Sequence, residues 1–168
     1  MTLSMYQASV PVFARQFASL TAILDKAEAS AAERGIDPAQ LLEARLAPDM
    51  HPLTRQVQIA SDAVKGGIAR LGGVEMPSFP DTETSFAELK ERIAKTVAFI
   101  ESVPADKIDG SEERAITLKI ADREMTFPGQ TFLLGFVLPN FFFHVSIAYA
   151  LLRSNGVEIG KRDYLGGV

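Results

Sequence analysis

Two amides and a histidine are the side chains best suited to chemistry in this sequence. Asn140 and His144 lie four residues apart in an uncharged, apolar segment, so a helix would place both on one face. An imidazole in such surroundings needs a hydrogen-bond partner, and it can act as a structural group, a base or a ligand. Gln56 lies at the edge of a second apolar stripe and can supply that partner. The place where they would meet is the interior of a helical bundle.

Structural interpretations of the same residues stay open. His144 can be a core histidine whose hydrogen bonds are satisfied, and Gln56 can be a boundary residue that reaches water. His51 is a weaker candidate because it precedes an expected helix start, where the helix dipole disfavours protonation. The helix face that it begins is charged and is expected to lie in water: Arg55, Gln58, Asp62 and Lys65.

Composition excludes several classes of protein. The 168 residues include 17 Lys and Arg against 21 Asp and Glu, a net charge of −4, so we expect no nucleic-acid or membrane partner. With no cysteine there can be no disulfide, thiolate nucleophile or cysteine-ligated zinc, and two histidines exclude a three-histidine metal site. The sequence lacks H-E-x-x-H, G-x-S-x-G and EF-hand motifs, and Gly156–Lys161 is one residue short of a Walker A motif. The N-terminus has no secretory pattern, so a cytoplasmic location is expected.

The first half of the chain predicts two long helices. An apolar stripe runs from Tyr6 to Ala27, and capping-box spacing of Ser4 and Gln7 predicts a start near Met5. Pro11 either bends this helix or marks its true first turn, and Arg34-Gly35 ends it. A short helix follows Asp37 and stops before Pro48. The second long helix is expected to be capped by Asp49, to hold Pro52 in its first turn and to end at Gly72-Gly73.

A third helix follows a linker over residues 74–81. Ser85 and Glu88 have capping-box spacing ahead of an apolar stripe that runs to Ile100. On the other face, Glu88 with Arg92 and Glu91 with Lys95 have the spacing of ion pairs in water.

Beyond Pro104 the apolar period changes from 3.6 to 2, which predicts a β-hairpin. A turn at Asp122-Arg123 would place Ile120 opposite Met125 and Leu118 opposite Phe127, with all four on one face.

The last long helix is expected from Thr131 to Asn155, with Gly156 as its left-handed stop. Pro139 cannot bond to residue 135, a glycine, so its ring meets no side chain there and a kink is tolerable. The stretch from Thr131 to Leu152 is uncharged and long enough to cross a bilayer. Polar residues in its middle favour a buried central helix instead. Residues 1–168 thus predict one mainly α domain, a four-helix bundle with a small hairpin before the last helix.

Several segments resemble a known family. They are Arg45–Leu53, Asp81–Leu89, Pro139–His144, Ala148-Tyr149, Leu152-Arg153 and Gly160–Tyr164. Together they resemble the domain-of-unknown-function family DUF1993, a branch of the DinB/YfiT-like metalloenzyme superfamily. The resemblance implies an up-down-down-up bundle with a crossover between its second and third helices, and a homodimer.

The resemblance also implies a site. DinB-like proteins bind a divalent metal through three histidines, two of them four residues apart on the last helix. His144 lies nine residues before Arg153, as the second of these does, whereas Asn140 takes the place of the first. The second helix offers only Gln56 or Gln58. Since amide oxygen is a poor ligand for zinc or nickel, this degenerate site predicts no resident metal and at most weak binding of a divalent ion. The resemblance then implies that the hollow between the helices remains as a small polar pocket lined by Asn140, His144 and Gln56.

Three functions follow as hypotheses. The first is a small-molecule-binding or stress-related cytoplasmic protein with a degenerate metal site. The second is a metal-dependent, thiol-transferase-like enzyme, in which His144 is a ligand and His51 or a carboxylate completes the shell. The third is a structural homodimerising module, in which Asn140 and His144 only fix helix register. The tail Gly160–Leu165 is expected to dock through Tyr164, on the bundle or on a second subunit.

Overall fold

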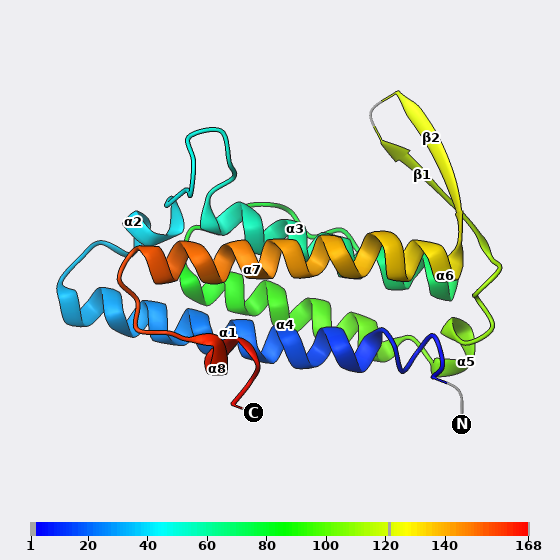
Figure 1. The fold of residues 1–168 in the computed structure, drawn as a ribbon, viewed down its shortest axis with the longest axis horizontal. Coiled ribbons are helices and arrows are strands. Elements are labelled where there is room, and N and C mark those ends of the chain that lie inside the picture. Colours follow the sequence, from blue (N-terminus) through cyan, green and yellow to red (C-terminus); the bar gives the residue numbers. More distant parts are fainter. Residues whose placement is uncertain (1–2, 121, 168) are drawn as a thin grey trace.

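Four long helices lie side by side and carry the rest of the chain (Figure 1). The computed structural model describes residues 3–120 and 122–167. The long helices are α1 (Val10–Arg34), α3 (Leu53–Gly72), α4 (Phe86–Ser102) and α7 (Leu138–Ser154). The short elements are α2 (Pro38–Leu42), α5 (Ala105–Ile108), β1 (Ala115–Ile120), β2 (Arg123–Pro128), α6 (Gly129–Phe132), the π-helix η1 (Leu133–Val137) and α8 (Lys161–Tyr164). Because α1 and α7 run opposite to α3 and α4, the predicted up-down-down-up bundle is confirmed.

The core lies where the apolar stripes of the four helices meet. Helix α3 packs against α7 and α4, and α1 packs against α4 and α7. Phe13 and Phe17 of α1 contact Phe141 of α7 edge to face, with ring centroids 5.1 and 4.9 Å apart. All three rings are fully buried. This packing fixes α7 and so fixes the direction of the polar side chains that it carries.

Two helix starts differ from the predictions. Ser4 and Gln7 do exchange capping hydrogen bonds, but they close a turn, and α1 begins only at Val10. The start near Met5 was therefore wrong, and Pro11 marks the true first turn, where its missing N–H costs nothing. Asp49 does not cap α3, because Pro52 takes the N-cap position ahead of Leu53.

Helix ends and the α4 cap follow the predictions more closely. Gly35, Gly73 and Gly156 adopt the left-handed conformation, with φ of 61°, 61° and 85°. At the start of α4, Ser85 Oγ accepts from the Glu88 N–H at 3.2 Å, and the Glu88 carboxylate accepts from the Thr84 N–H at 2.7 Å.

The hairpin has its expected apolar face but a different register. Leu118 pairs with Met125 and Ile116 with Phe127, so the predicted pairing was wrong by two residues. Since a shift of two restores the same side of the sheet, both apolar sets still share one face. The strands meet at Ile120 and Arg123. The Ile120 side chain and Ala121, on which the predicted turn partly depended, lie outside the described residues.

The last rod combines α6, η1 and α7 instead of bending at Pro139. The Leu138 N–H donates to the Leu133 carbonyl five residues back, so the helix widens into a π turn just before the proline. The 26 residues Gly129–Ser154 form one helix long and apolar enough to cross a membrane, and 39% of its most apolar window is buried. The rod packs on α3 and α1, whereas Leu134 and Phe143 are exposed, so the buried central helix predicted from the sequence is buried only in part.

The C-terminal tail docks on the bundle of its own chain. The Tyr164 carbonyl accepts from Gln16 Nε2 at 3.1 Å, and the Tyr164 hydroxyl lies 3.0 Å from Ser146 Oγ. Asp163 forms an ion pair with Lys26 of α1 at 2.6 Å. Helix α8 therefore packs against both α1 and α7 on the outside of the bundle.

Candidate functional site

His144 and Gln56 meet between α7 and α3. The His144 Nδ1 atom lies 2.6 Å from Gln56 Oε1. Gln56 is buried in spite of its amide, and the imidazole is half-buried. The side chains come from the helix pair that forms the largest interface in the bundle, so the contact joins two rigid elements.

A second hydrogen bond fixes the direction of this contact. Gln56 Nε2 donates to the backbone carbonyl of His51 at 3.0 Å. The amide oxygen must then face His144, and an oxygen only accepts, so the proton lies on Nδ1 of the ring. Nε2 consequently carries a lone pair. Two contacts thus select one tautomer of His144.

The surroundings of His144 keep its ring neutral. Burial lowers the pKa of His144 below its usual 6.5, and the positive charges of His51 and Arg55 lower it further. Within the part of the chain that the structure describes, Nε2 has no hydrogen-bond partner, and it is not among the buried unpartnered atoms. At neutral pH the ring therefore offers one accessible acceptor atom and no charge.

Asn140 does not join this pair. It lies one turn before His144 on α7 and lines a separate cleft between α3, η1 and β1, together with Arg70 and Phe136. Of the predicted pocket, the structure brings together His144 and Gln56 and leaves Asn140 beside them. The His51 side chain is exposed, as expected, and only its backbone carbonyl takes part.

A buried ion network on the other side of α3 was missed by sequence reasoning. Arg92, expected in water with Glu88, has a side chain only 1% exposed, and that prediction was wrong. Its guanidinium lies 2.9 Å from Asp62, 3.0 Å from Asp81 and 2.9 Å from Glu83. Only the Glu91–Lys95 pair forms as predicted, at 2.6 Å.

The crossover segment, residues 73–85 between α3 and α4, covers the face of α3 that begins near His51 and was expected to lie in water. Gln58 is buried and donates to Glu83 at 2.9 Å, and Arg55 pairs with Asp81. Lys65 is buried too, with its Nζ 4.3 Å from the centre of the Phe79 ring. The signal in the sequence was the pair of acids after Pro80, Asp81 and Glu83, which are opposite in charge to Arg55 and Arg92.

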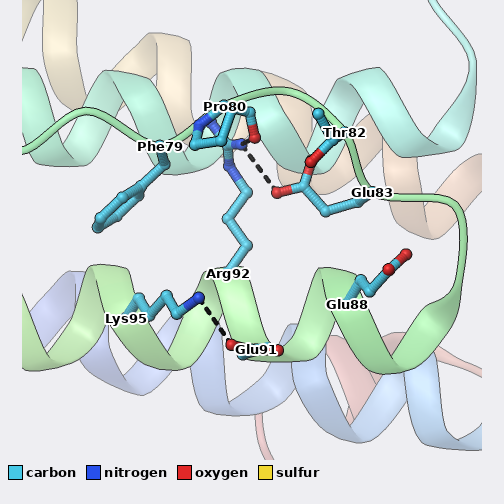
Figure 2. A pocket seen from close by; sticks show the side chains of 8 residues that line it. All are labelled: Phe79, Pro80, Thr82, Glu83, Glu88, Glu91, Arg92 and Lys95. Carbon is cyan, nitrogen blue, oxygen red and sulfur yellow. Dashed lines mark hydrogen bonds and ion pairs between the residues drawn. The ribbon is translucent and has the colours of Figure 1, made fainter.

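Figure 2 shows the hollow beside this network, about 210 Å³ in volume, with Arg92 reaching from α4 to the segment Phe79–Glu83. Burial acts to raise the pKa of Glu83, but hydrogen bonds from Arg92 and Gln58 bring it below its usual value. Burial likewise acts to lower the pKa of Arg92, but the acidic partners of Arg92 outweigh this effect and raise its pKa. Since Glu83, Glu88 and Glu91 all have partners here, we assign the hollow a structural role.

The side chains at the predicted site do not fit a tightly bound divalent metal. Gln56, not Gln58, faces His144, so the position that could offer a ligand from α3 holds an amide. Asn140 adds another amide. Among residues 3–120 and 122–167, no group of three His, Cys, Asp or Glu side chains is placed to hold a metal ion. One imidazole with two amides is a poor donor set for zinc or nickel.

Comparison with known proteins agrees with this fold. The model of the family described as Domain of unknown function (DUF1993) matches residues 5–165. The chain belongs to the DUF1993 family. It is similar to a crystal structure described as a DinB family member protein from Shewanella denitrificans, with 39% sequence identity and a TM-score of 0.87. The likeness covers 97% of this chain and 92% of that one. No curated protein matches it.

Membership of DUF1993 and the likeness to a DinB family structure confirm the resemblance drawn from Pro139–His144 and the other segments. In this DUF1993 chain the bundle is DinB-like, and the candidate site is one histidine held by a glutamine.

Proposed function

We propose that this DUF1993 protein is a small-molecule-binding protein of the cytoplasm, in which His144 Nε2 accepts a hydrogen bond from the ligand. The observation that carries the proposal is the relay from His144 Nδ1 through Gln56 to the His51 carbonyl. The relay holds the ring in one orientation and one tautomer before any ligand arrives. Such preorganisation lowers the cost of binding.

The low pKa of His144 supports binding over acid–base catalysis. A ring kept neutral by burial and nearby positive charge is a weak base, but its lone pair still accepts a hydrogen bond. The donor set argues against the metal-dependent alternative, because Gln56 and Asn140 stand where further ligands would be required.

NMR on protein with ¹⁵N-labelled histidine tests the proposal. We expect the His144 nitrogens to report the Nδ1–H tautomer at neutral pH. Phenol, an O–H donor, should shift the Nε2 resonance, whereas anisole, which has the same ring but no donor, should not. Equal shifts with both compounds, or none with phenol, would contradict the proposal.

Two variants sharpen this experiment. His144→Ala should abolish the binding of phenol, whereas His51→Ala should keep it, because the relay uses only the His51 backbone carbonyl. Elemental analysis of the purified protein adds an independent check. A stoichiometric first-row metal that is lost in His144→Ala would favour the metal-dependent enzyme instead.

A second observation favours assembly as well. The open face of the α6–η1–α7 rod leaves Leu134 50% and Phe143 53% exposed, with no charged residue between Gly129 and Leu152. We propose that a second copy of the chain packs on this face. The exposed side carries no charge that would repel a second copy, and 26 residues extend about 39 Å at 1.5 Å per residue, long enough for a stable helix-pair interface.

Light scattering during size-exclusion chromatography tests the assembly. We expect a dimer that Phe143→Asp converts to a monomer, whereas Leu46→Asp, at another exposed apolar residue, leaves it intact. A monomeric wild-type protein would overturn the proposal. Sedimentation of the wild-type protein with phosphatidylcholine vesicles would overturn it in favour of a membrane.

A further inference from the structure

The cleft that Asn140 lines is a separate site with a chemistry of its own. It has a volume of about 330 Å³ and lies between α3, η1 and the first strand of the hairpin. Its lining contains neither His144 nor Gln56. Its side chains fall into a cationic set, an apolar set and one amide.

Positive charge dominates the cleft. Arg70 and Lys119 are exposed, and within residues 3–120 and 122–167 neither has a carboxylate within ion-pair distance. The one acid in the lining, Asp62, is already engaged, since its Oδ1 lies 3.0 Å from Lys65 Nζ and 2.9 Å from Arg92 Nη2. Arg55 also lines the cleft and is held by Asp81. Two cations therefore remain for a ligand.

Arg70 is held at the cleft by the helix that carries it. Its Nη1 donates to the Gly66 carbonyl at 2.8 Å, so the guanidinium folds back along α3. A Cβ at Gly66 would lie 2.6 Å from this nitrogen, and only glycine leaves it that space. One N–H group of the guanidinium donates to the backbone, and the remaining N–H groups can bind an anion.

The apolar set forms a stack of phenyl rings. Phe132 and Phe136 line the cleft with ring centroids 5.9 Å apart and planes 16° apart. Phe127 of the hairpin stacks behind Phe136, at 6.4 Å and 24°. Phe132 is only 1% exposed, so the stack presents mainly the half-buried Phe136 to the cleft, as an apolar wall for an aromatic or branched group.

Asn140 completes the cleft. Its side chain is half-buried and makes no hydrogen bond to any described residue. It follows η1, and π-helical turns occur often at functional sites. The amide can donate to one ligand oxygen and accept from another group.

From this combination we infer that the cleft binds a small organic anion, with a carboxylate or phosphate monoester at Arg70 and Lys119 and an apolar ring against Phe136. The inference goes beyond the proposed role of His144, because it uses none of the atoms of the relay.

Titration calorimetry with matched probes tests it. Phenyl phosphate and phenylacetate carry the two kinds of anion, and phenylacetamide is the neutral counterpart of the second. We expect one or both anions to bind, more weakly as salt rises, and the amide not to bind. Binding of phenyl phosphate alone identifies a phosphate ester site, and binding of both identifies a general site for aromatic anions.

Paired variants separate this site from a general effect of charge. Arg70→Gln with Lys119→Gln should weaken binding about tenfold or more, since charged hydrogen bonds are lost. Lys107→Gln with Arg162→Gln changes the net charge equally, outside the cleft, and should leave binding unchanged. His144→Ala should also leave it unchanged, so failure here is distinct from failure of the relay.

Three results would overturn the inference: no binding of either anion at millimolar concentration, equal binding of phenylacetamide, or equal losses in the two double variants. All four substituted cations are exposed, and the salt dependence of the wild-type protein gives a readout that needs no variant.

Discussion

Replacement of Gln56 by glutamate tests the relay at its central residue. The substitution keeps the shape of the side chain but replaces the amide by a carboxylate. In the wild-type protein the amide oxygen lies 2.6 Å from His144 Nδ1, so the carboxylate would face the same ring nitrogen. An anion there stabilises the imidazolium, so the pKa of His144 should rise from its lowered value to above its usual one.

The size of the effect follows from the distance. Opposite charges about 4 Å apart interact by about 4 kcal/mol at an effective dielectric constant of 20, which corresponds to about three pH units. His144 is only half-buried. The second carboxylate oxygen would also face the His51 carbonyl, to which Gln56 Nε2 donates a hydrogen bond in the wild-type protein. Both effects make the rise in the pKa of His144 smaller, so we expect its titration midpoint to move up by about 1–2 pH units.

The same change should reverse the dependence of stability on pH. In the wild-type protein the folded pKa of His144 lies below the unfolded value, so the folded state binds fewer protons. That contribution to stability is present above the unfolded pKa and is lost as pH falls below about 6.5 through the folded pKa. In Gln56→Glu the folded pKa is the higher one, so the contribution is present at low pH and is lost as pH rises through it.

Proton NMR of the two histidines across pH measures the midpoints, with His51→Ala used for assignment. Urea unfolding at a series of pH values measures the slopes. Gln40→Glu is the matched control, since Gln40 is exposed on α2 and the same charge there should leave His144 unchanged. A His144 midpoint that stays in place in Gln56→Glu would refute the assigned tautomer and with it the relay.

Three further predictions concern the ion network, the rod and the donor set. Arg92→Met leaves Glu83 without its main partner and should lower the free energy of unfolding by about 2–4 kcal/mol in urea, whereas Lys95→Met at an exposed pair should change it by less than about 0.5 kcal/mol. Loss of Arg92 should also raise the pKa of Glu83. In the wild-type protein the lowered pKa of Glu83 stabilises the folded state above the unfolded pKa near 4.5, and this stabilisation is lost as pH falls through the folded pKa. In Arg92→Met the loss of stability over this acid range should be smaller. Gly129→Ala places a Cβ 2.0 Å from the Ser111 carbonyl oxygen and should cost about 2–4 kcal/mol, whereas Gly135→Ala meets nothing within 4 Å and should be neutral or stabilising by up to about 1 kcal/mol; equal thermal shifts would count against this packing. Gln56→His combined with Asn140→His should bind zinc far more tightly than the wild-type protein in a competition assay with a chelating dye, and unchanged affinity would show that amide ligands are not what limits metal binding.

Much of the fold could be predicted because its determinants are local. Apolar periodicity located the four long helices, and Gly35, Gly73 and Gly156 marked the ends of α1, α3 and α7. Helix starts were less predictable, because the Ser4–Gln7 box forms in a turn as well as in a helix. In the same way, alternation revealed the hairpin but not its register, since a shift of two residues satisfies the same pattern.

The site was predictable only in part, because burial of a polar residue depends on what covers it. Spacing alone suggested that His144 and Gln56 lie in the interior, and the structure brings them into contact. The buried position of Arg92 could not follow from its own helix, where it has the spacing of an exposed ion pair. It depends on the crossover segment, whose path over α3 and α4 brings Asp81 and Glu83 to the guanidinium.

The relay resembles the outer half of a metal-binding histidine arrangement. A histidine that binds a metal through one ring nitrogen donates the other N–H to a neighbouring acceptor, which sets its tautomer. His144 retains that outer half of the arrangement, with Gln56 as the acceptor and Nε2 left accessible. Asn140 and Gln56 supply neither a further imidazole nor a charge. What remains is a neutral ring, fixed between two rigid helices, that can accept a hydrogen bond but is too weak a donor set to hold an ion alone.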